Sequence, residues 1–190
     1  GNLDIASEHL QTSLTLFQSL QANLQTAHVI NDIASLANTL GDLQMAQDYY
    51  RQAIAIYEKL GKQDKALRSI GNLGLTYLHA KQYDRAYDCI QQHLNFSRES
   101  GNRAYLRFTL SNLGDVVFAQ EKYTEAVNYY TESLSLKYDI GDSAWSICYT
   151  LVRLGFAQLT LQQIEPATQT FAKVLQLYTK EHVRRALILQ

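Results

Sequence analysis

The chain has 190 residues, and its 17 Lys and Arg against 18 Asp and Glu give a formal net charge of −1 at pH 7. Because phosphate backbones and anionic lipids attract basic surfaces, this balance argues against nucleic acid or a membrane as a partner. One Pro, nine Gly and 46% hydrophobic residues favour continuous helix over sheet or flexible linker.

The first twenty residues predict one amphipathic helix. Their apolar side chains follow the three- and four-residue steps of a single helical face, at Leu3, Ala6, Leu10, Leu14 and Phe17. When Gly1 is aligned with Gly41, these positions match those of residues 43–60, which we expect to be the second helix of a pair. The chain is therefore expected to start half a repeat in, as a piece of a longer polypeptide.

Four complete helix pairs are expected next, over residues 23–40 with 43–60, 63–80 with 83–100, 103–120 with 123–140, and 143–161 with 164–180. A further helix is expected to begin near His182. Three of the second helices are followed by Gly61, Gly101 and Gly141, where a left-handed C-terminal cap favours a residue without a Cβ. Pro166 falls in the first turn of its helix, where its missing N–H costs no hydrogen bond.

One unit of sequence recurs along the chain at a spacing of about forty residues, in 30–50, 70–90, 110–130 and 151–171. The last copy is delayed because Gly141 to Leu154 is one step longer than the same interval in the preceding unit. We expect the turn near residues 142–145 to absorb the extra residue, as a longer loop or a π-bulge. The self-similarity predicts an all-α helical-repeat protein.

Small residues recur at fixed positions of this unit. The first helices carry Gly74, Gly114 and Gly155, and the second helices carry Ala46, Ala86, Ala126 and Ala167. A Gly inside a helix costs about 1 kcal/mol relative to Ala. The three helical glycines are therefore expected where two helices approach too closely for a Cβ.

The unit resembles the tetratricopeptide repeat (TPR) signature through the spacing Ile70-x2-Leu73-Gly74-x2-Tyr77 and Ala86-x3-Ile90. Ile or Leu stands in place of the usual Trp, and the period is about forty residues rather than 34, because each second helix is longer. The resemblance covers essentially the whole chain. Repeats of this length resemble those of Pins-type spindle-orientation adaptors and of the sensor arrays of bacterial STAND regulators.

The resemblance implies a TPR-like α-solenoid, a right-handed superhelix of antiparallel helix pairs in one array over residues 1–190. Its expected divisions are the second helix of a truncated repeat (1–21), complete repeats (22–61, 62–101, 102–141 and 142–181) and the start of a further helix (182–190). In this family the first helices line a concave groove. When the groove positions of the family are transferred to this sequence, the expected groove residues are Arg68, Asn72, Leu75, His79, Phe108, Asn112, Asp115, Tyr149, Arg153 and Phe156, with Ser111 on the same wall.

Polar side chains at one repeated groove site, Asn72, Asn112 and Arg153, are not required by the packing pattern. We expect their joint change to Ala to leave folding nearly intact and to weaken ligand binding. Asn112 and Arg153 also match two residues of the carboxylate clamp of TPR co-chaperones. The remaining clamp positions hold Gly71, Leu75 and Tyr149 instead of Lys, Asn and Lys, so a dedicated clamp is not expected. Arg153 can still pair with an acidic side chain.

No catalytic motif is found, and we expect neither an enzyme nor a cofactor. His28 and Asp32 lie four residues apart, but a metal site needs three or four ligands.

Cys89 and Cys148 form no CxxC pair and are expected to be small packing residues in a reducing, cytoplasmic compartment. The N-terminus lacks a signal-peptide layout, and no apolar run approaches the roughly 20 residues that span a bilayer.

The expected function is a protein-interaction scaffold that binds a partner peptide or helix in the concave groove. The alternative is the sensory array of a signalling or transcription regulator, in which the groove binds a small inducer or the protein's own effector domain. A third possibility is self-association through the end helices, because the apolar face of residues 2–20 has lost its cover.

Overall fold

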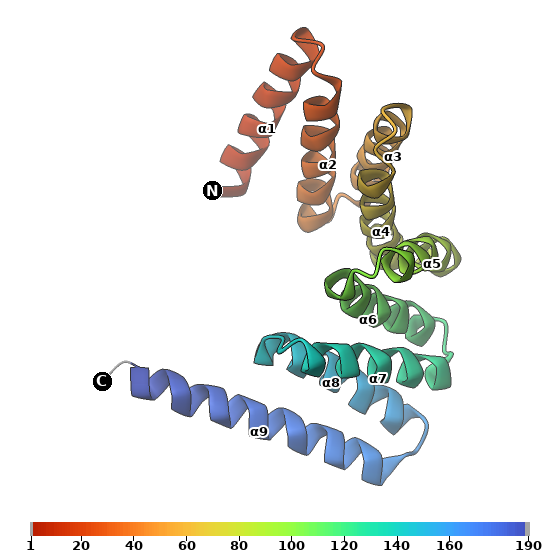
Figure 1. Ribbon diagram of the computed structural model, residues 1–190, viewed down its shortest axis with the longest axis vertical. Helices are drawn as coiled ribbons and strands as arrows, with labels where there is room; N and C mark the ends of the chain where they lie inside the picture. Colours follow the sequence, from red (N-terminus) through yellow and green to blue (C-terminus); the bar gives the residue numbers. More distant parts are fainter. Residues whose placement is uncertain (1, 189–190) are drawn as a thin grey trace. The chain divides into compact units, whose positions relative to one another are not determined.

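The computed structural model describes the backbone of residues 2–188 and the side chains of residues 3 and 5–179. All regular structure in this part of the chain is helical, which confirms the predicted all-α class (Figure 1). The helices are α1 (Asn2–Ser19), α2 (Asn23–Leu40), α3 (Leu43–Lys59), α4 (Gln63–His79), α5 (Tyr83–Glu99), α6 (Arg103–Ala119), α7 (Tyr123–Asp139), α8 (Ala144–Thr160) and α9 (Ile164–Ile188).

The last helix differs from the sequence prediction. α9 runs without a break from Ile164 to Ile188, so no separate helix begins at His182. The repeat places His182 where the preceding unit has Gly141, and His lacks the ease with which Gly adopts a left-handed cap. The residues that follow are mostly good helix formers, so the helix continues past the expected boundary.

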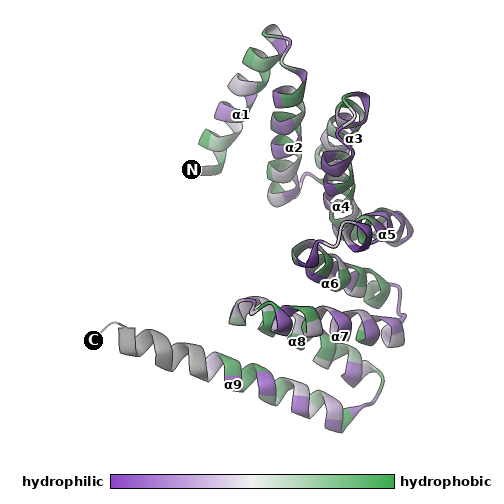
Figure 2. Cartoon of the chain, in the orientation of Figure 1, coloured by the Kyte–Doolittle hydropathy of each residue, from purple (hydrophilic) through white to green (hydrophobic). Residues whose placement is uncertain are grey.

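Two compact units make up the chain, Gly1–Phe96 and Ser97–Gln190, and α5 spans their boundary. The single array over all residues stays a prediction. Figure 2 shows that each helix carries both hydrophobic and hydrophilic residues, as expected for helices that bury one face. No described helix is long and apolar enough to cross a membrane.

Unit 1, residues 1–96, has its core between consecutive helices α1, α2, α3 and α4. The buried cluster consists of Leu14, Ala27, Val29, Ile30, Ile33, Ala53, Tyr57 and Ala66. α1 also leaves the apolar side chains of Leu3, Ile5 and Leu16 exposed, as does Leu20 in the turn that follows it. The predicted self-association through this helix stays a prediction.

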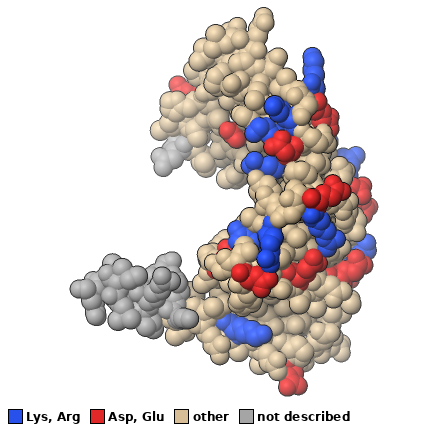
Figure 3. Space-filling view, in the orientation of Figure 1, with Lys and Arg blue, Asp and Glu red and all other residues tan. Residues whose placement is uncertain are grey.

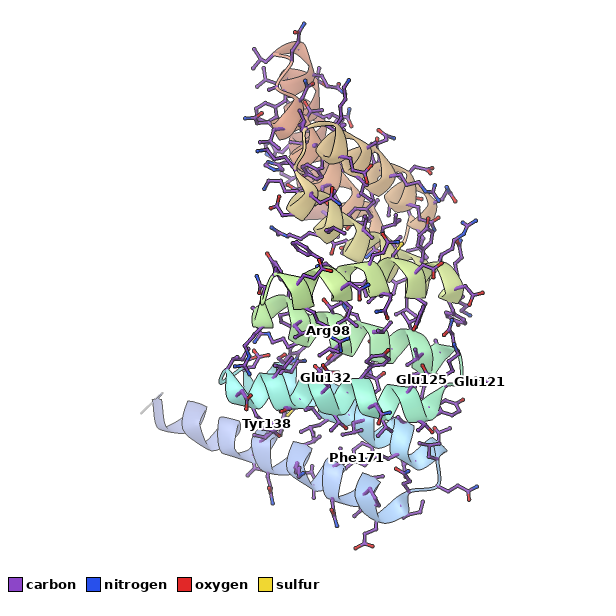
Figure 4. The ribbon with its side chains drawn as sticks, turned by 45° about the vertical axis from the view of Figure 1, so that its right-hand side comes forward. Arg98, Glu121, Glu125, Glu132, Tyr138 and Phe171 are labelled. Carbon is purple, nitrogen blue, oxygen red and sulfur yellow. The ribbon has the colours of Figure 1, made fainter. Side chains whose placement is uncertain are left out.

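Unit 2, residues 97–190, packs α6 on α7, α7 on α8 and α8 on α9. A Cβ on Gly114 would lie 2.5 Å from Cε1 of Tyr130, and one on Gly155 would lie 2.6 Å from Cζ of Phe171 on α9. Both distances are too short for real Cβ contacts, so the predicted close approach at these glycines is confirmed. Arg98 Nη2, near the end of α5, donates to Glu132 Oε1 of α7 at 3.2 Å (Figure 4).

The turn between α7 and α8 absorbs the extra residue, as predicted. α8 begins at Ala144, three residues after Gly141, whereas α6 begins two residues after Gly101. Ser143 Oγ accepts from the backbone N–H of Ser146 at 3.3 Å and so caps the helix. Gly155 consequently still reaches its packing site against α9.

The helix ends carry a second regularity that the sequence analysis missed. Gly61, Gly101 and Gly141 have φ values of +67°, +62° and +68°, which confirms the predicted left-handed caps of the second helices. The first helices α4, α6 and α8 are also followed by left-handed residues, but these are Lys81, Glu121 and Gln162. With Gln21 after α1, four turns of the described chain are therefore closed by residues for which a positive φ is unfavourable.

Candidate partner-binding surface

In unit 1 the predicted groove residues lie on α4. Arg68, Asn72 and His79 are exposed and Leu75 is half-buried. His79 Nδ1 lies 3.2 Å from Oδ1 of Asn38, so a polar contact joins α4 to α2. This arrangement places the four residues on one helix of unit 1, and their contact with a ligand stays a prediction.

In unit 2 the predicted residues come from α6 and α8. The aromatic side chains stay accessible: Phe108 is 45% exposed, Tyr149 40% and Phe156 53%. Asn112 is half-buried on α6. These exposed rings on successive first helices are the kind of residue that dominates binding energy at protein interfaces.

Asp115 corrects one prediction, because it is a buried internal partner and not a groove-lining carboxylate. It is 9% exposed, and its Oδ1 accepts from Tyr130 OH at 2.7 Å and from Arg153 Nη1 at 2.9 Å. Tyr149 OH lies 3.4 Å from Oδ2. A carboxylate at this position is held by charge and hydrogen bonds from three side chains.

Arg153 also takes part in this buried cluster, and its bonds there argue against the prediction that its change to Ala leaves folding nearly intact. Besides the bond to Asp115, its Nη2 donates to Tyr149 OH at 2.7 Å, and its Cζ lies 4.7 Å from the centre of the Tyr149 ring. Burial raises the pKa of Asp115, and the Arg153 cation opposes this effect most strongly. Changing Arg153 to Ala would leave a buried carboxylate without its cation.

Ser111 was predicted to lie on the groove wall, but it is 3% exposed. Its Oγ lies 2.8 Å from Ser133 Oγ and 3.1 Å from Thr150 Oγ1. Thr150 in turn accepts from Lys137 Nζ at 2.6 Å, and Lys137 also donates to the carbonyl of Ser146. These side chains form a buried polar network between α6, α7 and α8.

Lys137 is the unexpected member of this network. It is 1% exposed, and burial lowers its pKa to about 8. A signal existed in the sequence, because the equivalent positions one and two repeats earlier hold Ser97 and Tyr57, which are also buried. Beside it, Arg107 Nη1 and Asp142 Oδ2 form an ion pair at 2.8 Å.

Two hollows adjoin Arg153. The larger, of about 380 Å³, is lined by Phe118, Tyr130, Arg153, Phe156 and Thr160. The smaller, of about 270 Å³, is lined by Trp145, Cys148, Tyr149, Val152 and Arg153. Arg153 belongs to both linings and thus separates two mostly apolar depressions.

Trp145 is a member of this surface that the sequence analysis did not assign to it. It is 78% exposed and stacks on Tyr149, with ring centroids 5.9 Å apart and an interplanar angle of 24°. Its four-residue spacing from Tyr149 on one helix was the available signal. We call Trp145, Tyr149, Arg153 and Phe156 the α8 face.

The chemistry of this surface suits recognition. No group of three or more His, Cys, Asp or Glu that could hold a metal occurs among the described residues. On the face drawn in Figure 3, Lys and Arg atoms lie among Asp and Glu atoms of the described residues, without a large area of one sign. On such a face recognition depends on local features, and the α8 face with its hollows is the candidate.

The described helices follow one another in antiparallel pairs with small residues at their crossings, which defines an α-helical repeat protein. The chain belongs to the tetratricopeptide repeat family, whose family model matches residues 1–59 and 64–139.

A relative in sequence is the anaphase-promoting complex subunit cut9 of Schizosaccharomyces pombe. It is 30% identical over 103 residues, which cover 54% of this chain and 14% of that protein. The chain thus spans a small part of the length of this relative.

Solved structures show the same fold. BtubC (BKLC) from P. vanneervenii superposes with a TM-score of 0.86 at 18% identity, over 96% of this chain and 75% of that chain. A STAND protein with a tetratricopeptide repeat sensor from Pyrococcus horikoshii gives a TM-score of 0.77 at 16% identity, over 96% of this chain and 29% of that chain. At these identities the likeness concerns the fold alone.

Proposed function

We propose that this chain is a non-enzymatic protein-interaction module, and that unit 2 binds a segment of a partner protein on the α8 face. The observation that carries this proposal is the line of three exposed aromatic side chains around Arg153, between two apolar hollows. Exposed rings next to a cation form hot spots because they bury much apolar area and offer directed hydrogen bonds. The relative cut9, by its name a subunit of a protein complex, is consistent with a protein partner.

The volumes of the two hollows limit the size of the partner side chains that can bind in them. A volume of about 380 Å³ accommodates a large apolar side chain, and full burial of such a side chain contributes roughly 1.5–3 kcal/mol. Two such anchors in the two hollows would contribute roughly 3–6 kcal/mol before the cost of ordering the segment is subtracted, so micromolar binding, at about 8 kcal/mol, would also need contacts outside the hollows. A peptide or helix of a partner therefore matches the surface better than a large rigid domain.

The remaining predicted residues extend this proposal. Phe108 and Asn112 on α6 would contact the same segment in unit 2, and the amide of Asn112 can both donate to and accept from a peptide backbone. Arg68, Asn72, Leu75 and His79 would contact a partner on unit 1. The likeness to Pins-type adaptors, with their forty-residue repeats, belongs to this proposal as well.

The test is selection of binders from a random linear peptide library displayed on phage, with the whole chain immobilised. Selected peptides should lose at least fivefold in affinity for Phe156→Ala, because truncation of a hot-spot ring costs more than about 1 kcal/mol. Tyr138→Ala is the matched control, since Tyr138 is a 49% exposed ring on α7 outside the α8 face (Figure 4). Equal loss in both variants, or none in either, would place the binding site elsewhere.

One observation favours a second function. The larger hollow falls within the roughly 300–1,000 Å³ range of small-molecule sites, and the STAND sensor shares the fold. In that case the hollow would bind a small inducer. Small-molecule hits from a thermal-shift screen that are lost in Phe156→Ala, together with an empty peptide selection, would favour this function.

A further inference from the structure

We infer that the partner segment carries a carboxylate that binds Arg153 between two apolar side chains, and that Asp115 attenuates this site by cancelling part of the Arg153 charge. This inference rests on the proposed function, because it specifies the chemistry of the segment that the α8 face binds. It assigns to Asp115 a role in specificity in addition to its structural one.

The hydrogen-bond capacity of Arg153 is the first argument. A guanidinium has five N–H groups, and two of them donate within the chain, one to Asp115 and one to Tyr149. The other three have no hydrogen-bond partner among the described residues, and the side chain as a whole is 41% exposed and lines both hollows. A planar donor group at such a position fits a carboxylate better than any neutral acceptor.

Charge complementarity is the second argument. Arg153 is the only charged residue among the described residues that line the two hollows, and α8 contains no other charged residue. The nearby carboxylate of Asp115 is 9% exposed and already bonded. An acidic group on a partner therefore finds an accessible cation, whereas a basic group finds no accessible carboxylate in these hollows.

The position of Asp115 explains the attenuation. Its Oδ1 lies 2.9 Å from Arg153 Nη1, so it orients the guanidinium and at the same time repels a second carboxylate. Asn at this position keeps an oxygen that can accept from Arg153 and from Tyr130, but it removes the negative charge. Asp115→Asn should therefore strengthen binding of an acidic segment while the guanidinium keeps its place.

The experiment uses peptides selected from the random library against the whole wild-type chain. We expect enrichment of Asp or Glu flanked by large apolar residues, and a roughly tenfold loss of affinity when that acid is changed to its amide. Asp115→Asn should raise the affinity of the acidic peptide at least threefold and leave that of the amide peptide within twofold. Raising the salt concentration should weaken the acidic peptide selectively.

Two controls isolate the charge on Asp115. Asp139→Asn removes the same charge from an exposed residue of unit 2 that pairs with Arg103 at 2.7 Å, and it should change affinity less than twofold. Arg153→Gln combined with Asp115→Asn replaces the ion pair by a neutral pair and should bind the acid and amide peptides equally. This double variant avoids leaving a buried carboxylate without a cation.

The outcomes separate the two proposals. A library that yields no peptide overturns the proposed function and the inference with it. Selected peptides that lack an acid, or that are enriched in Lys and Arg, overturn the inference and leave peptide binding standing. The same holds if Asp115→Asn lowers or does not change the affinity of an acidic peptide.

Discussion

Replacing Gly114 by Ala tests the helix crossing that supports the binding surface. The new Cβ would lie 2.5 Å from Cε1 and 2.7 Å from Cδ1 of Tyr130, whereas carbon atoms in contact lie about 3.5–4.0 Å apart. The ring would have to move by about 1 Å. Tyr130 is 1% exposed and its OH is bonded to Asp115, so a shift of the ring would strain this bond and change the lining of the larger hollow.

The expected effect is a net loss of up to about 2 kcal/mol in the free energy of unfolding if the Tyr130 hydrogen bond survives, and of about 1.5–5 kcal/mol if it is lost. Ala favours the helix by about 1 kcal/mol, but overpacking costs roughly 1–3 kcal/mol. A weakened hydrogen bond from Tyr130 to the buried carboxylate adds roughly 1.5–3 kcal/mol if it is lost. For a unit of this size, each kcal/mol lowers the melting temperature by about 4–8 °C.

Urea and thermal unfolding followed by circular dichroism measure the change, and Ser135→Ala serves as control. Ser135 is exposed on α7, so its replacement reports helix propensity without overpacking. Gly114→Leu should be still more destabilising, whereas Glu121→Leu should not destabilise. A rise in melting temperature for Gly114→Ala, of the size that propensity alone gives, would refute the contact between Gly114 and Tyr130.

Three further predictions concern single sites. Glu121→Gly should raise the free energy of unfolding by about 1 kcal/mol, because Glu121 is exposed at φ +64°; an unchanged urea midpoint would contradict this. The pKa of Lys137 lies near 8 in the fold and near 10.5 when unfolded, so the unfolded chain binds more protons between these values and stability should rise with pH there. Lys137→Met should abolish this rise relative to wild type in urea titrations at several pH values. Arg153→Ala should lower the free energy of unfolding by about 1–3 kcal/mol, whereas Asn72→Ala with Asn112→Ala should leave the melt unchanged.

The repeat explains why the fold was predictable. Gly61, Gly101 and Gly141 recur at one period, and each combines a helix end with a backbone conformation that few other residues adopt. The apolar and small residues between these glycines repeat the same packing pattern. A helix boundary that is uncertain in one repeat can therefore be placed from the equivalent position in the next repeat. The period ends at His182, where no Gly marks a boundary, and there the prediction was wrong.

The candidate binding surface was less predictable because polar side chains do not reveal their partners in the sequence. Asp115 and Arg153 stand 38 residues apart, and only the packing of α6 against α8 shows that they neutralise each other. Lys137 and Ser111 are polar residues at positions that the repeat buries, and a buried polar network compensates for them. Lys and Ser side chains are usually solvated at the surface, but packing against the neighbouring helices buries Lys137 and Ser111.

The turn between α7 and α8 also has a consequence for protein engineering. Its additional residue leaves the contact between Gly155 and Phe171 in place, so this junction tolerates a change of length without altering the register of the following helix pair. Gly141 is exposed, and Asp142 and Ser143 hold the start of α8 through Ser146. A foreign loop grafted between Gly141 and Asp142 would leave those bonds intact but would break the backbone hydrogen bond from Asp142 N–H to the Lys137 carbonyl at 2.9 Å, so an engineered insertion here would have to supply a new cap for the end of α7.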